Sequence, residues 1–126
     1  MSYTGITPTS FKKHALAISL GLLTQPFAWA APAVNALPVL GNIASGTANV
    51  SKDSNQNKLT VNQQSDKLIA NWNSFNVGEN AQVIFNQPSA SSIALNRIGG
   101  NTASQIFGRV SANGQLILVN PAGLTI

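Results

Sequence analysis

Ser104–Ile126 reads Ser-Gln-Ile-Phe-Gly-Arg-Val-Ser-Ala-Asn-Gly-Gln-Leu-Ile-Leu-Val-Asn-Pro-Ala-Gly-Leu-Thr-Ile, and it predicts strand, turn, strand, turn and the start of another strand. Ala112-Asn113-Gly114 is a turn signal, because Asn and Gly tolerate the positive φ that β-branched residues avoid. Gln115–Val119 is an apolar run of strand length, which predicts burial on both faces. Asn120-Pro121-Ala122-Gly123 ends that run as a type I or II turn, since its proline fixes φ at about −65° and its glycine can become left-handed.

Short strands are also expected upstream of this stretch, from Gly46 onward. No segment there spaces its apolar residues at i, i+3 and i+4, as an amphipathic helix does. The sequence therefore predicts an all-β chain. The expected strands are Lys58–Asn62, Lys67–Asn71, Gln82–Asn86, Ser92–Asn96, Ser104–Phe107 and Gln115–Asn120.

The expected strands carry a repeat of about 24 residues. The apolar members of alternate strands form two series, Leu59, Val83 and Ile106, and Leu68, Ile93 and Leu116. Amide side chains repeat likewise, at Asn71, Asn96 and Asn120 and at Asn62 and Asn86. Such a period predicts parallel coils that stack like residue over like, with hydrogen-bonded Asn ladders. A β-sandwich remains the alternative, because regular strand spacing suits that fold too.

The two ends of such a stack are expected to differ from its middle, because an end coil leaves backbone groups unpaired. Ala33–Gly46 is apolar and rich in Pro and Gly, and we expect it to cap the first coil. The last residues, Leu124-Thr125-Ile126, fall inside an expected strand, so we expect the last coil to be incomplete.

The first thirty residues have the three parts of a secretory signal peptide. Lys12-Lys13-His14 is the basic region, and Ala15–Leu23 is an apolar core too short to span a bilayer. Ala28-Trp29-Ala30 fits the cleavage rule, which makes Ala31 the first mature residue. We therefore expect residues 1–30 to be the signal, residues 31–126 to be the mature domain, and no membrane span after cleavage. An uncleaved anchor or a buried helix is the alternative.

Charge and residue usage exclude several function classes. The formal charge is +4 and the pI about 10.0, but only five basic and three acidic residues lie beyond the leader. They form no basic stripe, so nucleic acid is not an expected partner. Residues 31–126 contain no Cys and no His, the usual ligands of zinc, haem and iron–sulfur centres and the usual members of catalytic triads. Asp53, Asp66 and Glu79 lie in predicted turns, so we expect neither an enzyme nor a cofactor.

Several motifs, in this order and spacing, resemble those of one known family. They are Trp72–Gly78, Val83–Pro88 with Ala94–Ile98, Ile106-Phe107-Gly108 leading to Ala112–Gln115, and Asn120–Leu124. The chain from about Leu37 onward resembles the N-terminal secretion domain (haemagglutination activity domain) of two-partner-secretion exoproteins. These exoproteins are filamentous haemagglutinin-like adhesins, haemolysins and contact-dependent growth-inhibition toxins.

The resemblance implies a right-handed parallel β-helix with an N-terminal cap. It also implies a secretion-targeting module of a large surface or secreted adhesin or toxin, exported through the periplasm. The expected partner is the periplasmic part of a cognate outer-membrane β-barrel transporter, with a host surface or competitor cell as a further partner. The alternative is a stand-alone β-helix adhesin that contacts host glycan or matrix.

The family motif at the end of the chain is Asn-Pro-Asn-Gly followed by an aliphatic residue. Asn120, Pro121, Gly123 and Leu124 match it, whereas Ala122 replaces the second Asn. The resemblance therefore implies a transporter-recognition role for this turn, without a side-chain role for its third position. A secondary family motif is expected at Asn86, Gln87, Pro88, Asn96 and Arg97.

Overall fold

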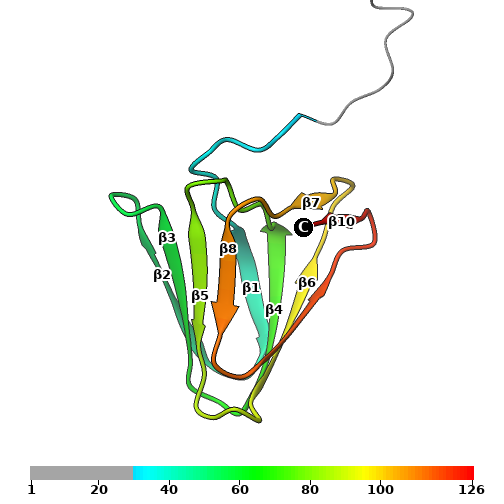
Figure 1. Ribbon diagram of the computed structural model, residues 1–126. Coiled ribbons are helices and arrows are strands. Elements are labelled where there is room, and N and C mark those ends of the chain that lie inside the picture. The colour runs from blue at the N-terminus through cyan, green and yellow to red at the C-terminus, as the bar shows by residue number, and fades with distance from the viewer. Residues whose placement is uncertain (1–29) are drawn as a thin grey trace, which may run out of the picture. The chain divides into compact units, whose positions relative to one another are not determined.

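The computed structural model describes residues 30–126, which hold ten β-strands and no helix (Figure 1). Residues 31–126 form one compact unit. None of the described residues belongs to a helix that could cross a membrane. The strands are β1 (Val39–Ser45), β2 (Ala48–Asp53), β3 (Lys58–Gln63), β4 (Lys67–Ser74), β5 (Gln82–Asn86), β6 (Ile93–Ile98), β7 (Ser104–Gln105), β8 (Arg109–Ala112), β9 (Gln115–Val119) and β10 (Leu124–Thr125).

Two four-stranded sheets face each other, in the orders β1-β4-β6-β9 and β2-β3-β5-β8 (Figure 1). The pairs β3–β5, β5–β8, β4–β6 and β6–β9 are parallel, and the successive strands from β3 to β6 alternate between the two sheets, as do β8 and β9. The chain therefore winds through three stacked coils, as the repeat predicts, rather than forming an antiparallel sandwich. A short third side completes each coil, where Val77 bridges Ile106 and β10 runs parallel to β7.

The strands form where buried and outward residues alternate, as the two-residue side-chain period of a strand requires. On β4, Leu68, Ala70 and Trp72 are buried while their neighbours are more exposed. The Trp72 ring meets that of Phe75 edge-on, with 5.2 Å between centroids, at the corner where the chain leaves β4. Phe75 is fully buried, so this corner is part of the core.

The first two strands differ from the rest because they pair antiparallel. β1 lies along β4 with several register shifts, and β2 lies along β3 in continuous register. The chain passes from β1 to β2 through Gly46, whose φ of 84° favours glycine. β1 and β2 thus supply hydrogen-bond partners to the main-chain groups of β4 and β3 at the edges that face away from the following coils. Half of the segment expected to form the cap, Ala33–Gly46, is thus a strand, from Val39 to Ser45.

The predicted apolar columns are correct only in part. Leu59 pairs with Val83 as expected, but the third member is Val110, because Ile106 lies on the third side against Val77. In the other sheet, Leu68 and Leu116 flank Ala94 instead of Ile93. Ile93 faces outward, since a shift of one residue reverses the face of every side chain.

The predicted Asn ladders are likewise correct only in part. Asn86 Nδ2 donates to Asn62 Oδ1 at 3.0 Å, so that ladder is confirmed. The ladder through Asn71 and Asn96 is wrong, because Asn71 pairs with Arg97 and Asn96 turns into the core. The cause is again the one-residue shift of β6.

Two predictions for the last stretch are corrected. Burial of Gln115–Val119 on both faces is wrong, since Ile117 and Val119 are 48% and 44% exposed. No described residue packs over that outer face, so its apolar side chains stay uncovered. The strand expected at Ser104–Phe107 is shorter, since β7 ends at Gln105, and β8 begins only after Gly108, where a Cβ would collide with the carbonyl oxygens of two other residues. β7 and β8 are therefore separate strands.

Candidate recognition turn at Asn120–Leu124

The predicted turn at the end of β9 is present and is closed by two hydrogen bonds. The Gly123 N–H donates to the Asn120 carbonyl oxygen at 3.0 Å, and the Ala122 N–H donates to Asn120 Oδ1 at 2.9 Å. Gly123 has a φ of 122°, a conformation that L side chains rarely adopt. The glycine is therefore a requirement of the backbone at this position.

The Asn120 side chain also anchors the turn to a preceding segment. Its Nδ2 group donates to the Thr102 carbonyl oxygen at 3.1 Å and to Ser104 Oγ at 2.9 Å. The Ser104 N–H in turn donates to the Gly123 carbonyl oxygen at 3.0 Å. Both amide hydrogens of Asn120 are thus used within the chain, so this side chain builds the turn rather than facing a partner.

The tip of the turn is what faces outward. Pro121 and Ala122 are exposed, and Leu124 beyond them is 40% exposed. Ala122 contributes its main-chain N–H to the turn, and that group is present in any residue except proline. The Ala at the third motif position therefore leaves the turn geometry intact.

The residues of the predicted secondary motif are not brought together into one site. Gln87 and Asn96 are buried, whereas Asn86, Pro88 and Arg97 are exposed. Asn86 and Pro88 lie at the end of β5, whereas Arg97 lies on β6 in the opposite sheet. Asn86 continues an amide ladder, and the Nε group of Arg97 donates to an Asn side chain on the neighbouring strand. The described contacts of this set are structural ones.

The buried side chain of Gln87 joins a hydrogen-bond network that was not predicted from the sequence. Its Nε2 group donates to Gln63 Oε1 at 3.2 Å and to the Gln115 carbonyl oxygen at 3.0 Å, while its Oε1 accepts the Gly114 N–H at 2.8 Å. One side chain thus joins all three coils at the same corner. The repeat could have predicted the contact between Gln63 and Gln87, because these residues are 24 positions apart.

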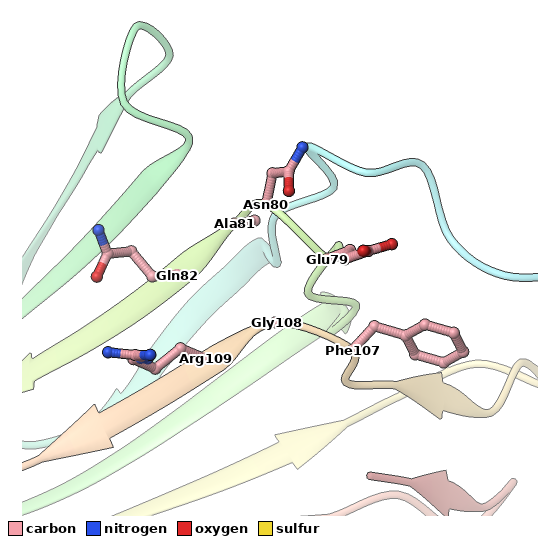
Figure 2. Close-up of a pocket in the computed structure, with 7 residues that line it drawn as sticks. All are labelled: Glu79, Asn80, Ala81, Gln82, Phe107, Gly108 and Arg109. Atoms are coloured by element: carbon pink, nitrogen blue, oxygen red, sulfur yellow. The ribbon is translucent and has the colours of Figure 1, made fainter.

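A surface groove of about 390 Å³ lies between the segment before β5 and the start of β8 (Figure 2). Figure 2 shows Gln82 and Arg109 pointing to one side and Glu79 and Phe107 to the other, so these side chains do not converge on one point. The lining residues are Glu79, Asn80, Ala81, Gln82, Phe107, Gly108 and Arg109.

Asp53 and Asp66 each accept a hydrogen bond from another residue of the chain. Asp53 Oδ1 accepts the Asn55 N–H at 3.0 Å, and Asp66 Oδ1 accepts the Ser92 hydroxyl at 3.1 Å. Within residues 30–126, no group of three or more His, Cys, Asp or Glu side chains could hold a metal ion.

Residues 41–126 match the family model described as the TPS secretion domain, and the chain belongs to this family. It is thus a secretion domain of two-partner-secretion exoproteins, which is a family of secretion modules and not of enzymes. The match confirms the resemblance inferred from the motifs between Trp72 and Leu124.

Three similar proteins come from Haemophilus influenzae. A heme/hemopexin-binding protein of strain Rd is 40% identical over 109 residues, covering 86% of this chain and 12% of that protein. A second heme/hemopexin-binding protein is 42% identical over 81 residues, covering 64% of this chain and 9% of that protein. The crystal structure of the HMW1 secretion domain aligns with a TM-score of 0.61 and 36% identity, covering 66% of this chain and 22% of that chain. The chain therefore spans about a tenth of the length of these curated relatives.

Of the predicted signal peptide and its cleavage site, the described residues include only Ala30 and Ala31. Both are exposed and lie outside the strands. Ala28 and the rest of the leader lie outside the described residues, so cleavage after Ala30 stays a prediction.

Proposed function

We propose that residues 31–126 direct a longer bacterial exoprotein to its cognate outer-membrane β-barrel transporter. The exoprotein crosses the inner membrane behind a cleaved leader, and the transporter's periplasmic domains recognise the module. It then folds into coils outside the cell, as a secreted or surface-attached adhesin or toxin. The observation that carries this proposal is the secretion-domain match over residues 41–126, which includes the exposed turn at Asn120–Leu124.

Recognition uses the exposed tip of that turn and not its asparagine. Pro121 and Ala122 are exposed, and Pro121 limits the backbone freedom that binding would otherwise have to remove. Before it folds, the chain also offers unpaired main-chain N–H and C=O groups, which can add as a strand to a receptor's sheet.

The winding is right-handed in this proposal, and β1 and β2 act as the N-terminal cap. Connections between parallel strands of one sheet are right-handed in nearly all known cases. The antiparallel pairing of β1 with β4 and of β2 with β3 covers the edge of the first coil, which supports the capping role.

Folding outside the cell needs no nucleotide, because stacking the coils buries apolar side chains. Val61, Val83 and Ala94 have no exposed surface, and Leu68 is 1% exposed. Each fully buried Val or Leu side chain contributes roughly 1.5–3 kcal/mol before conformational entropy is subtracted.

Haem binding, which the relatives' names describe, does not fit residues 31–126. These residues contain no His, Cys, Met or Tyr, the side chains that hold haem iron axially. Hemopexin binding belongs to relatives that are many times longer than this segment.

The proposed function is tested by export of the whole exoprotein from cells that contain the cognate transporter. Asn120→Asp removes the donors to Thr102 and Ser104 and sets a carboxylate against the carbonyl oxygen of Thr102, so secreted protein should fall several-fold. Pro121→Ala should reduce export less, because the turn keeps its hydrogen bonds. The measurement is the amount of exoprotein in the medium and in the periplasm by immunoblot.

The matched control is Asn55→Asp, the same change in the exposed turn between β2 and β3. It should leave export unchanged, and leader cleavage should proceed in all variants. Undiminished export of the Asn120→Asp protein would count against the role of the turn.

A further inference from the structure

The buried serine beneath the recognition turn contacts both ends of that turn. Ser104 is 1% exposed, and its Oγ accepts a hydrogen bond from Asn120 Nδ2 at 2.9 Å. Its main-chain N–H donates to the Gly123 carbonyl oxygen at 3.0 Å. One residue therefore holds the first and last positions of the turn at once.

Ser104 is itself fixed from the preceding coil. The N–H of Gln105, its neighbour on β7, donates to Asn76 Oδ1 at 2.9 Å, and the Gln105 carbonyl oxygen accepts the Val77 N–H at 3.0 Å. β7 is only two residues long, so these contacts replace the regular ladder of a longer strand. Polar contacts thus run without a break from Asn76, through β7, to Asn120.

We propose that Ser104 is a positioning residue for transporter recognition, an inference that rests on the function proposed above. Its hydroxyl orients the Asn120 amide, whose Oδ1 in turn holds the Ala122 N–H at the tip. Without the hydroxyl, Asn120 keeps one of its two acceptors and can rotate. The tip then samples more conformations, and the transporter must order it on binding.

The residue type fits this role better than the alternatives. A hydroxyl accepts the amide hydrogen at a part-buried position, where a hydrogen bond is stronger than at the open surface. Alanine would leave the Asn120 amide hydrogen without this acceptor, but it would keep both main-chain hydrogen bonds of Ser104 and so preserve β7. Ser104→Ala is therefore a local perturbation.

Ser92→Ala is the matched control. Ser92 has no exposed surface, and its Oγ accepts the Ser89 N–H at 3.1 Å and donates to Asp66 Oδ1 at 3.1 Å. It lies just before β6, at a different corner of the coils. The two variants lose the same group from equally buried sites, so a general loss of stability affects both.

Two readouts on the full chain separate positioning from folding. The first is hydrogen exchange of the Ala122 and Gly123 amides, which Ser104→Ala should accelerate about tenfold and Ser92→Ala should leave within about twofold. The second is affinity for the purified periplasmic domains of the cognate transporter. Ser104→Ala should weaken binding about tenfold, which corresponds to about 1.4 kcal/mol, and Ser92→Ala should not.

Equal exchange and equal affinity in the two variants would overturn the positioning role. Faster exchange with unchanged affinity would also overturn it, because the turn would be loosened without consequence for recognition. Failure of the unsubstituted chain to bind the periplasmic domains is a different result. It would refute the proposed function, and with it the recognition part of this inference.

Discussion

Replacing Asn96 by Leu tests whether the core depends on one buried polar contact. Asn96 has no exposed surface, and its Oδ1 accepts the indole N–H of Trp72 at 2.8 Å. Its Nδ2 group donates to the carbonyl oxygens of Ala94 and Ile117, each at 3.3 Å. Leu is close to Asn in size but has no polar atom, so Trp72 would keep a buried N–H with no partner.

The expected cost follows from that lost acceptor. A buried donor without a partner costs about 1–3 kcal/mol, and the two weaker contacts of the Asn96 amide are lost as well. The apolar surface of Leu offsets part of this loss, and about 2 kcal/mol of destabilisation remains. For a unit of this size, 1 kcal/mol shifts Tm by about 4–8 °C, so Asn96→Leu should lower Tm by about 10 °C.

The assay is thermal and urea unfolding of the full chain, followed by far-UV circular dichroism. The control is Asn71→Leu, the same change on the outer face of the same sheet, where Asn71 Oδ1 accepts from Arg97 Nε at an exposed position. It should change stability by less than about 0.5 kcal/mol. Trp72→Phe should cost about 1 kcal/mol less in the Asn96→Leu chain than in the unsubstituted chain, since no indole N–H is then left without a partner. Equal stability of the Asn96→Leu and Asn71→Leu chains would refute the reasoning.

Three further predictions concern stability and are checked by the same unfolding measurements. Gln87→Leu should cost about 2–3 kcal/mol, because it leaves polar groups of other coils without partners, whereas Gln64→Leu at an exposed position should cost little. Gly108→Ala should cost about 3 kcal/mol, since its Cβ would lie within 3.0 Å of backbone carbonyl oxygens, whereas Gly99→Ala meets its nearest atom at 3.9 Å. Asn86→Ala breaks an exposed amide ladder and should cost less than about 0.5 kcal/mol.

The coil architecture was predictable from the sequence, but the register of β6 was not. The segment Ile93-Ala94-Leu95-Asn96 alternates as a strand should, yet the larger apolar residues face outward while Ala94 and Asn96 face the core. The side chain that decides this is Trp72, on the neighbouring coil, which needs an acceptor for its indole N–H. A rule that turns the most apolar face inward therefore chooses the wrong residue, because the constraint comes from a cross-strand neighbour.

The turn at Asn120–Leu124 was predictable from local chemistry, because Pro121 fixes its own φ and Gly123 permits the positive φ that the turn needs, whatever surrounds them. Its anchor was not, since Ser104 lies 16 residues upstream of Asn120, in a two-residue strand that shows no periodicity.

The short length of β7 and β10 explains why asparagine recurs on the third side of the coils. β7 and β10 share only two register pairs, so their main chains make few hydrogen bonds to each other. Side-chain amides supply the rest, from Asn76 to β7 and from Asn120 to Thr102 and Ser104. A substitution in this network should therefore loosen the turn while the two large sheets keep their own hydrogen bonds. That separation lets a loss of recognition be measured apart from a loss of fold.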